Sequence, residues 1–316
     1  MPKVSICLPN LNNCAYLEER LQSIYDQTVT DWELIIIDNY SDDGAWELFQ
    51  EHAAKEPRIR LSQAPKAGMY ANWNNTLKLV RGEWIYIATS DDTMYPECLE
   101  EFLNYHTRNS EARLMMCGIH TIDQKGNVLD NWHGSKKYPP RYTYGERLGA
   151  ECVLPNSMEF YSQIFACGVY QSITGVLFHR DVLDSVGPFA TDFSSAGDTA
   201  WIMNAVRSFP VHWIPKNLAT WRLHGNQGSR QSKKIVGISD RDRAVASSLK
   251  GAEDANYISG PEIVSIGKMQ SENRASRLNI LMKIMCKIGM RNPKFLNRAG
   301  WVEELVKNHY KTTCDE

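Results

Sequence analysis

Two adjacent carboxylates, Asp91 and Asp92, directly follow the apolar run 84–88. A buried strand that ends in acids places them at the edge of a sheet, where open α/β folds bind ligands. Carboxylate oxygens are hard ligands, so the pair suits a divalent cation, Mn²⁺ or Mg²⁺, that carries a phosphorylated substrate. Alternatively, the acids cap a helix near Pro96 or lie in a solvated turn. The sequence therefore predicts an enzyme that handles phosphates.

The elements that must position these acids alternate in type along the first half of the chain. Apolar, β-branched runs predict strands at 4–8, 33–37, 59–61 and 84–88. Helical spacing of apolar residues predicts helices at 16–25, 45–55 and 70–80, the last followed by Gly82 as a C′ glycine. This alternation predicts an α/β fold with a mostly parallel central sheet covered by helices on both faces. Asp38 is then a second acid at a strand end.

The second half is less regular. Residues 113–122 and 128–132 predict a strand pair about the turn 123–127, and the Pro-, Gly- and Tyr-rich stretch 133–170 predicts a long functional loop. Further elements are expected at 172–178 (strand), 180–186 (helix), 201–206 (helix, with Asp198 at its start), and 211–214 and 218–223 (strands, the second ending in His224). Polar helix formers beyond Gly228 predict a boundary near residue 230.

Composition narrows the class of protein. The chain has 316 residues, 43% of them hydrophobic, which is enough for a sizeable core, and its formal charge of −2 predicts no nucleic-acid partner. Its eight cysteines lack zinc-site spacing and are expected to be reduced thiols, most of them buried, in a cytosolic protein. The start of the chain does not read as a signal peptide, and no run of 18 apolar residues predicts a membrane span.

A series of short motifs over residues 1–230 resembles the family 2 glycosyltransferases of the GT-A fold. The motifs are Pro9-Asn10-Leu11-Asn12, Asp38-Asn39-Tyr40-Ser41-Asp42-Asp43-Gly44, Asn72-Trp73-Asn74, Gly82-Glu83, Thr89-Ser90-Asp91-Asp92, Gly187-Pro188-Phe189, Gly197-Asp198 and Trp221-Arg222-Leu223-His224. Each is weak alone, but their order and spacing together are specific. The resemblance implies a nucleotide-binding half at 1–95, an acceptor half at 96–230 and a helical C-terminal extension at 231–316.

The resemblance also implies roles for individual residues. Asp92 would hold the cation, Asp91 would contact the ribose or the metal, and His224 would be a further metal ligand or a donor to the diphosphate. Asp38 would accept a hydrogen bond from the base of the nucleotide. The whole set expected to contact the donor is Pro9, Asn10, Leu11, Asn12, Asp38, Lys66, Asn74 and Asp91.

Asp198 is the expected general base. Direct displacement at the anomeric carbon requires a carboxylate that takes the proton of the acceptor hydroxyl. A single base, with no second carboxylate as nucleophile, implies inversion of configuration.

Structural alternatives stand beside three of these roles. Asp38 can cap the amide of Ser41 or Gly44, and Asp198 can cap the helix that follows it. Lys66 reads almost equally well as a solvated lysine.

Four positions depart from the family pattern. Thr89 stands where the first acid of the Asp-x-Asp-Asp motif is expected, Asn39 replaces the second Asp of an Asp-Asp pair, and Gly197 replaces a common Glu. Trp73 stands where an Arg is often found, and it is expected to pack in the core or beneath the sugar. These departures put metal affinity and the donor-phosphate contacts in question.

The tail at 231–316 resembles nothing as closely. Its apolar face at Leu278, Leu281, Met282, Met285 and Ile288, with basic residues nearby, suits packing on the catalytic domain or a second subunit, or contact with an anionic membrane. A second helix is expected at 296–309.

The sequence therefore predicts a metal-dependent, inverting glycosyltransferase that uses a nucleotide-diphosphate sugar and a saccharide or lipid-linked acceptor. It would act in polysaccharide or glycolipid biosynthesis, in the cytoplasm or at the inner face of the membrane. The alternatives are a weakly active or inactive carbohydrate- or nucleotide-sugar-binding relative and a sugar nucleotidyltransferase. The last usually needs a Gly-rich basic loop after its first strand, which residues 9–13 do not supply.

Overall fold

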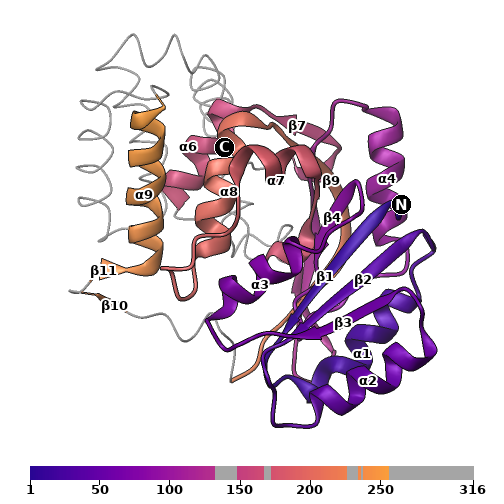
Figure 1. The fold of residues 1–316 in the computed structure, drawn as a ribbon. Helices are drawn as coiled ribbons and strands as arrows, with labels where there is room; N and C mark the ends of the chain where they lie inside the picture. The colour runs from indigo at the N-terminus through magenta and orange to yellow at the C-terminus, as the bar shows by residue number, and fades with distance from the viewer. Residues whose placement is uncertain (132–147, 167–171, 226–233, 236–237, 256–316) are drawn as a thin grey trace, which may run out of the picture.

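A nine-stranded sheet forms the centre of the molecule, with strand order β3-β2-β1-β4-β8-β5-β9-β7 and β6 paired with β5 (Figure 1). The computed structural model describes residues 1–131, 148–166, 172–225, 234–235 and 238–255. Strands β1 to β5 and β9 run in one direction, whereas β6, β7 and β8 run against them. The predicted mostly parallel sheet flanked by helices is confirmed.

The first half of the chain follows the predicted alternation. Its elements are β1 (Val4–Asn10), α1 (Cys14–Tyr25), β2 (Trp32–Asp38), α2 (Ala45–Lys55), β3 (Ile59–Gln63), α3 (Met69–Leu77) and β4 (Trp84–Ile87). Gly82 is not a C′ glycine of α3, which ends five residues earlier. Its role is close approach, because a Cβ at Gly82 would lie 2.6 Å from the main-chain N of Ser5.

The second half adds α4 (Cys98–Arg108), β5 (Leu114–Ile122), β6 (Val128–Asn131), β7 (Cys152–Leu154), α6 (Asn156–Ala166), the 3₁₀ turn η2 (Ile173–Gly175), β8 (Val176–His179), α7 (Arg180–Val186), α8 (Gly197–Ser208) and β9 (Val211–Arg222). The two strands expected at 211–214 and 218–223 form one strand, whose register against β5 shifts around Gly118. The expected strand at 172–178 begins as the η2 turn.

Two helices were missed. α4 buries Cys98, Leu99, Phe102 and Tyr105 on one face, a helical spacing that is visible in the sequence. The predicted loop at 133–170 is wrong over 152–166, where β7 and α6 lie, and its remaining residues lie outside the described ranges.

Each face of the sheet carries its own core. Val4, Ile6 and Leu8 of β1 pack with residues of α1, α2 and α4, whereas Cys7 between them belongs to the other core. That second core includes residues of α3, α6 and α8. Helices therefore cover both faces (Figure 1), because buried strands alternate their apolar side chains between the two sides.

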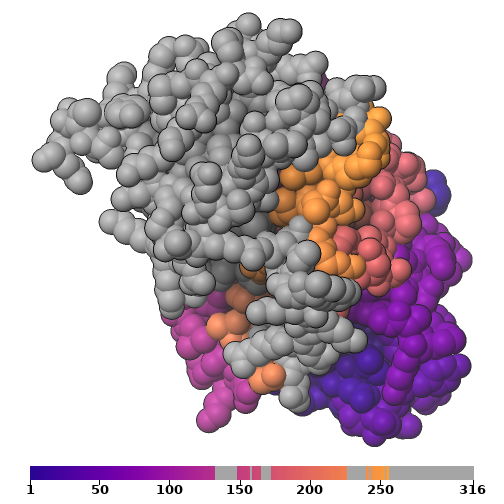
Figure 2. All heavy atoms as spheres, turned by 90° about the vertical axis from the view of Figure 1, so that its left-hand side faces the viewer, coloured from indigo at the N-terminus to yellow at the C-terminus, as the bar shows by residue number. Residues whose placement is uncertain are grey.

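Part of the predicted C-terminal extension is described, as β10 (Lys234–Ile235), β11 (Ile238–Ser239) and α9 (Asp240–Asp254). Figure 2 shows α9 at the surface beside the segment that contains α8, and Val245, Leu249 and Ala252 of α9 join the same core as α8. The helices expected around 278–288 and 296–309 lie outside the described residues. None of the described helices is both long and apolar enough to cross a bilayer.

Candidate active site

Five of the predicted site residues lie where the parallel strands end. Asn10 and Asp38 are paired at the carboxyl ends of β1 and β2, and Asp91 and Asp92 follow β4. His224 lies two residues beyond β9, which runs in the same direction. The parallel sheet thus brings these side chains to one edge, as the sequence predicted.

Asp91 and His224 are in direct contact. The Nε2 atom of His224 lies 2.9 Å from Oδ2 of Asp91. The Asp91 side chain is 20% exposed and the imidazole 4% exposed, and the Tyr16 ring lies 5.0 Å from the imidazole ring between centroids. A carboxylate with solvent access is therefore paired with an imidazole whose orientation is fixed by burial.

The side chain of Asp92, unlike that of Asp91, is buried in the protein. Its Oδ2 accepts hydrogen bonds from Oγ1 of Thr89 at 2.5 Å and from Oγ of Ser172 at 3.3 Å. Its Oδ1 accepts one from the amide of Arg222 at 2.8 Å. Burial, with the nearby charge of Asp91, raises the pKa of Asp92 to about 7. Thr89, the apparent departure from the family pattern, therefore donates a hydrogen bond that an ionised carboxylate at this position could not donate.

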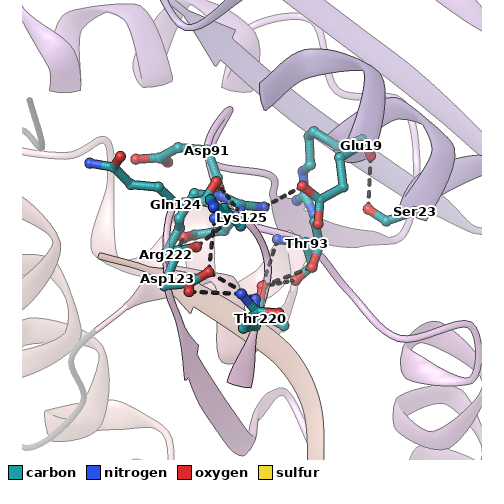
Figure 3. A network of polar contacts seen from close by, with 12 residues as sticks. Glu19, Ser23, Asp91, Thr93, Asp123, Gln124, Lys125, Thr220 and Arg222 are labelled. Atoms are coloured by element: carbon teal, nitrogen blue, oxygen red, sulfur yellow. Dashed lines mark hydrogen bonds and ion pairs between the residues drawn. The ribbon is translucent and has the colours of Figure 1, made fainter. Parts of the chain in front are cut away.

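Arg222 holds this part of the site together. Figure 3 shows its guanidinium between Glu19 and the segment of Asp91. Nε donates to the main-chain O of Asp91 at 2.7 Å, Nη2 to Oε2 of Glu19 at 2.6 Å, and Nη1 to the main-chain O atoms of Asp123 and Gln124. The side chain is fully buried. One arginine thus links α1, the Asp91 turn and the β5–β6 turn.

Asp38 fixes the loops that follow β1 and β2. It is fully buried, its Oδ1 accepts from Nδ2 of Asn10 at 2.9 Å, and its Oδ2 accepts from the amide of Ser41 at 2.8 Å. The alternative role as a cap of Ser41 is confirmed. Its predicted contact with a base stays a prediction.

The neighbouring loop residues differ in exposure. Asn12, which has a left-handed φ of 53°, exchanges two hydrogen bonds with Asp42. Leu11 is 43% exposed, whereas Pro9 is buried within β1. The loop after β1 is thus tied to the loop after β2, and it leaves Leu11 facing solvent.

Lys66 is exposed on the loop after β3, as its solvated alternative requires. That loop is held by Asn39, whose Nδ2 donates to the main-chain O atoms of Ala64 at 2.9 Å and Pro65 at 3.2 Å. An aspartate could not donate these bonds. The departure at Asn39 therefore has a structural reason.

Asn74 and Trp73 have packing roles. Nδ2 of Asn74 donates to the main-chain O of Phe189 at 2.8 Å, and its Oδ1 accepts from the Phe189 amide at 2.9 Å. Both ends of the amide are thus used within the protein, and the predicted donor contact of Asn74 stays a prediction. Trp73 is 4% exposed and packs edge-on against Tyr70 and Phe189, which confirms the core alternative.

Asp198 lies in the first turn of α8 and is not its N-cap, which is Ala196. Its Oδ1 accepts from the amide of Thr199 at 2.7 Å and from Oη of Tyr70 at 3.0 Å. Burial raises the pKa of its carboxyl above the usual range for aspartate. A carboxylate with raised pKa is a stronger base than an ordinary aspartate.

Sequence reasoning assigned no role to Arg222, Tyr70 or Glu19. Arg222 lies inside the motif Trp221-Arg222-Leu223-His224, so the sequence already indicated that it lies near the site. Tyr70 begins the helical pattern of α3, but nothing local indicates that it reaches across 128 residues to Asp198.

The side chains of Asp91 and His224 supply atoms that can bind a divalent cation. A carboxylate oxygen and an imidazole nitrogen are ordinary ligands of Mn²⁺-type ions. No group of three or more His, Cys, Asp or Glu side chains within the described ranges forms a complete metal site. Two protein ligands suit a cation that takes its remaining ligands from substrate phosphates and water.

The chain belongs to the glycosyl transferase family 2, whose model matches residues 5–164. It is 31% identical to chondroitin synthase of Escherichia coli over 131 residues, which cover 42% of this chain and 19% of that protein. The matches to other curated relatives also span less than two thirds of their length.

Two solved structures share the fold. Staphylococcus aureus TarS (residues 1–349), in complex with UDP-GlcNAc, aligns with a TM-score of 0.59 at 16% identity, covering 96% of this chain and 84% of that one. The mannosyltransferase PcManGT of Pyrobaculum calidifontis, in complex with GDP-Man and Mn²⁺, aligns with a TM-score of 0.51 at 15% identity, covering 90% and 85%. The GT-A fold expected from the sequence is confirmed.

Proposed function

We propose that this protein is a glycosyltransferase of polysaccharide or glycolipid biosynthesis. It moves a sugar from a nucleotide-diphosphate donor to a hydroxyl of a saccharide or lipid-linked saccharide acceptor. The observation that carries the proposal is the contact of Asp91 with His224 at the edge of the sheet where the parallel strands end, in a chain that belongs to family 2. TarS, which shares the fold, is bound to a donor of this class.

The reaction we propose depends on a divalent cation, Mn²⁺ or Mg²⁺. Asp91 and His224 would hold the cation. Asp92 would not bind it directly but would fix the turn that carries Asp91, through its hydrogen bonds to Thr89 and to the amide of Arg222. When bound, the cation neutralises the charge that develops on the leaving diphosphate. Arg222 keeps the Asp91 main chain and the strand that leads to His224 in register.

Asp198 acts as the general base in this proposal. As the acceptor oxygen forms its bond to the anomeric carbon, the bond from that carbon to the donor diphosphate breaks, and the acceptor proton passes to the Asp198 carboxylate. Attack from the side opposite the leaving group inverts the configuration. The raised pKa of Asp198 supports this role, because the carboxylate must accept a proton near neutral pH.

The donor nucleotide would lie along the ends of β1 and β2. Asp38 and Asn10 would shape the floor beneath the base, Pro9, Leu11 and Asn12 would line its side, and Lys66 would face the phosphates. The hydrogen bonds between the loops after β1 and β2 support this role, because they hold the two loops against each other.

Residues 231–316 would complete the domain at 1–230, as a platform for a second subunit or for the inner face of the membrane. Within the described part of this segment, α9 packs on α8, which carries Asp198. A cytoplasmic site of action is part of this proposal.

A screen of nucleotide sugars with the whole chain tests the proposal. A true donor should raise the melting temperature in the presence of Mn²⁺, because binding to the folded state stabilises it. The same donor should be turned over, and a chelator should stop turnover until Mn²⁺ is restored. Binding without turnover of any donor would favour a carbohydrate- or nucleotide-sugar-binding relative. Pyrophosphate release from a nucleoside triphosphate and a sugar phosphate would favour a nucleotidyltransferase.

A further inference from the structure

Tyr70 is the residue of α3 that reaches the start of α8. Its Oη donates to Oδ1 of Asp198 at 3.0 Å, and its ring lies against the main chain of Gly197. A Cβ at Gly197 would lie 2.6 Å from both Cδ2 and Cε2 of that ring. Glycine at 197, a departure from the family pattern, is therefore the residue that lets this tyrosine approach Asp198.

Packing fixes the tyrosine in this position. Its side chain is 2% exposed, and its ring lies 5.1 Å from Trp73 and 6.1 Å from Phe189 between centroids. Phe189 is in turn held by both ends of the Asn74 amide. Burial and the charge of Asp198 raise the pKa of Tyr70 well above its ordinary value, so the hydroxyl keeps its proton and donates.

The two oxygens of Asp198 are thereby made unequal. Oδ1 receives both Tyr70 Oη and the Thr199 amide. Apart from the main-chain N–H of Asp198 itself, no donor among the residues that the structure describes bonds to Oδ2. A carboxylate held by two donors at one oxygen cannot rotate freely, so the other oxygen has a set direction.

We propose that Tyr70 is a positioning residue for the general base, and that it leaves Oδ2 of Asp198 as the oxygen that takes the acceptor proton. This inference rests on the proposed function, since it requires Asp198 to be the base. It goes further than the proposed function in two ways. Oδ1 of Asp198 is assigned to the hydrogen bonds that hold the carboxylate, and Oδ2 to the acceptor proton. Gly197 is explained as the residue that leaves room for the Tyr70 ring.

The charged and titratable groups near Asp198 define the expected pH behaviour. Several elements pack on α8: α3, α6, α7 and α9. Among the side chains that the structure describes, their titratable groups are Tyr70 (α3), Glu159 and Tyr161 (α6), Arg180, Asp181 and Asp184 (α7), and Asp240, Arg241, Arg243, Lys250 and Asp254 (α9). The side chains that lower the pKa of Asp198 most are Tyr70, by its hydrogen bond, and Arg241, by its charge, against the larger opposing effect of burial.

Tyr70→Phe is the direct test, because it removes the hydroxyl and keeps the ring. We expect kcat to fall about tenfold and the acid limb of the kcat/KM–pH profile to move up by about one pH unit, since a hydrogen bond to the ionised form is lost. Tyr105→Phe is the matched control. Tyr105 is also buried and bonds to His212, which lies near the opposite end of β9 from His224. The acid limb of the kcat/KM–pH profile of Tyr105→Phe should stay at the wild-type pH.

A second variant reaches the same contact from the other side. Gly197→Ala should displace the Tyr70 ring and shift the acid limb in the same direction, so the proposal stays testable if Tyr70→Phe does not fold. Wild-type kcat and an unmoved acid limb in either folded variant would overturn the positioning role. Asp198→Asn distinguishes failure of this inference from failure of the proposed function. Turnover that survives Asp198→Asn would show that Asp198 is not the general base, whatever the result for Tyr70→Phe.

Discussion

The Nε2 atom of His224 lies 2.9 Å from Oδ2 of Asp91, although 133 residues separate the two in sequence. The contact exists because β9 runs parallel to β4 and ends at the same edge of the sheet. It joins the one partly exposed carboxylate of the Asp91-Asp92 pair to an imidazole that burial orients.

His224→Ala should reduce the affinity for Mn²⁺ while having a smaller effect on the stability of the fold. We expect the Mn²⁺ concentration for half-maximal turnover to rise at least about tenfold, since even the outer partners of metal ligands contribute that much to metal affinity. A metal titration of donor hydrolysis measures it. His52→Ala is the control, because His52 contacts Tyr25 and Glu18 away from the site. An unchanged titration with His224→Ala would remove His224 from the metal site.

Arg222→Met should destabilise the fold. The substitution removes a fully buried guanidinium and leaves the main-chain O atoms of Asp91, Asp123 and Gln124, in part-buried contacts, without this donor. Each unsatisfied group costs about 1–3 kcal/mol, so we expect the free energy of unfolding to drop by roughly 3 kcal/mol in urea melts. Glu19→Gln is the control, because Glu19 is half exposed and an exposed pair contributes about 0–1 kcal/mol. Equal losses in both variants would contradict this account.

Asp198→Asn should stabilise the protein at neutral pH while it lowers turnover by about 10²–10⁴-fold. The pKa of Asp198 is raised in the folded state, so the unfolded chain loses this proton first as the pH rises. Wild-type stability therefore falls from the ordinary aspartate pKa up through the raised folded pKa.

The stability gain of Asp198→Asn should accordingly be absent in strong acid and full above the folded pKa. Thermal melts from pH 3 to pH 8 measure the difference between the two proteins. A gain that is largest in acid would mean that the pKa of Asp198 is lowered instead.

Asn39→Asp restores the residue that the family pattern favours and should nevertheless destabilise this chain. The new carboxylate would face the carbonyl oxygens of Ala64 and Pro65 in a buried place, in exchange for two hydrogen bonds. We expect a loss of about 2–4 kcal/mol in the free energy of unfolding. Asn75→Asp is the control, because Oδ1 of Asn75 already accepts from Lys78 in a more exposed place. Unchanged stability of Asn39→Asp would refute the explanation given for Asn39.

The sequence alone predicted the strands and helices of the first half. Buried parallel strands read as continuous apolar runs, and those at 4–8, 33–37 and 84–88 lie within the observed β1 and β2 and over β4. Helix α2 was predicted to the residue, because Gly44 precedes it and its apolar spacing is regular. The order of the motifs was enough to predict the family and the edge of the sheet at which the acids meet.

Only the tertiary structure decided which of two neighbouring acids faces solvent. Asp91 and Asp92 look alike in sequence, but Asp92 is bonded to the amide of Arg222, 130 residues away, and Asp91 is not buried in the same way. Likewise, the contact of Tyr70 with Asp198 depends on how α3 packs on α8. Local patterns report burial along one element, whereas side-chain direction and long-range partners arise from packing between elements, and that packing decides which of two adjacent carboxylates keeps its access to solvent.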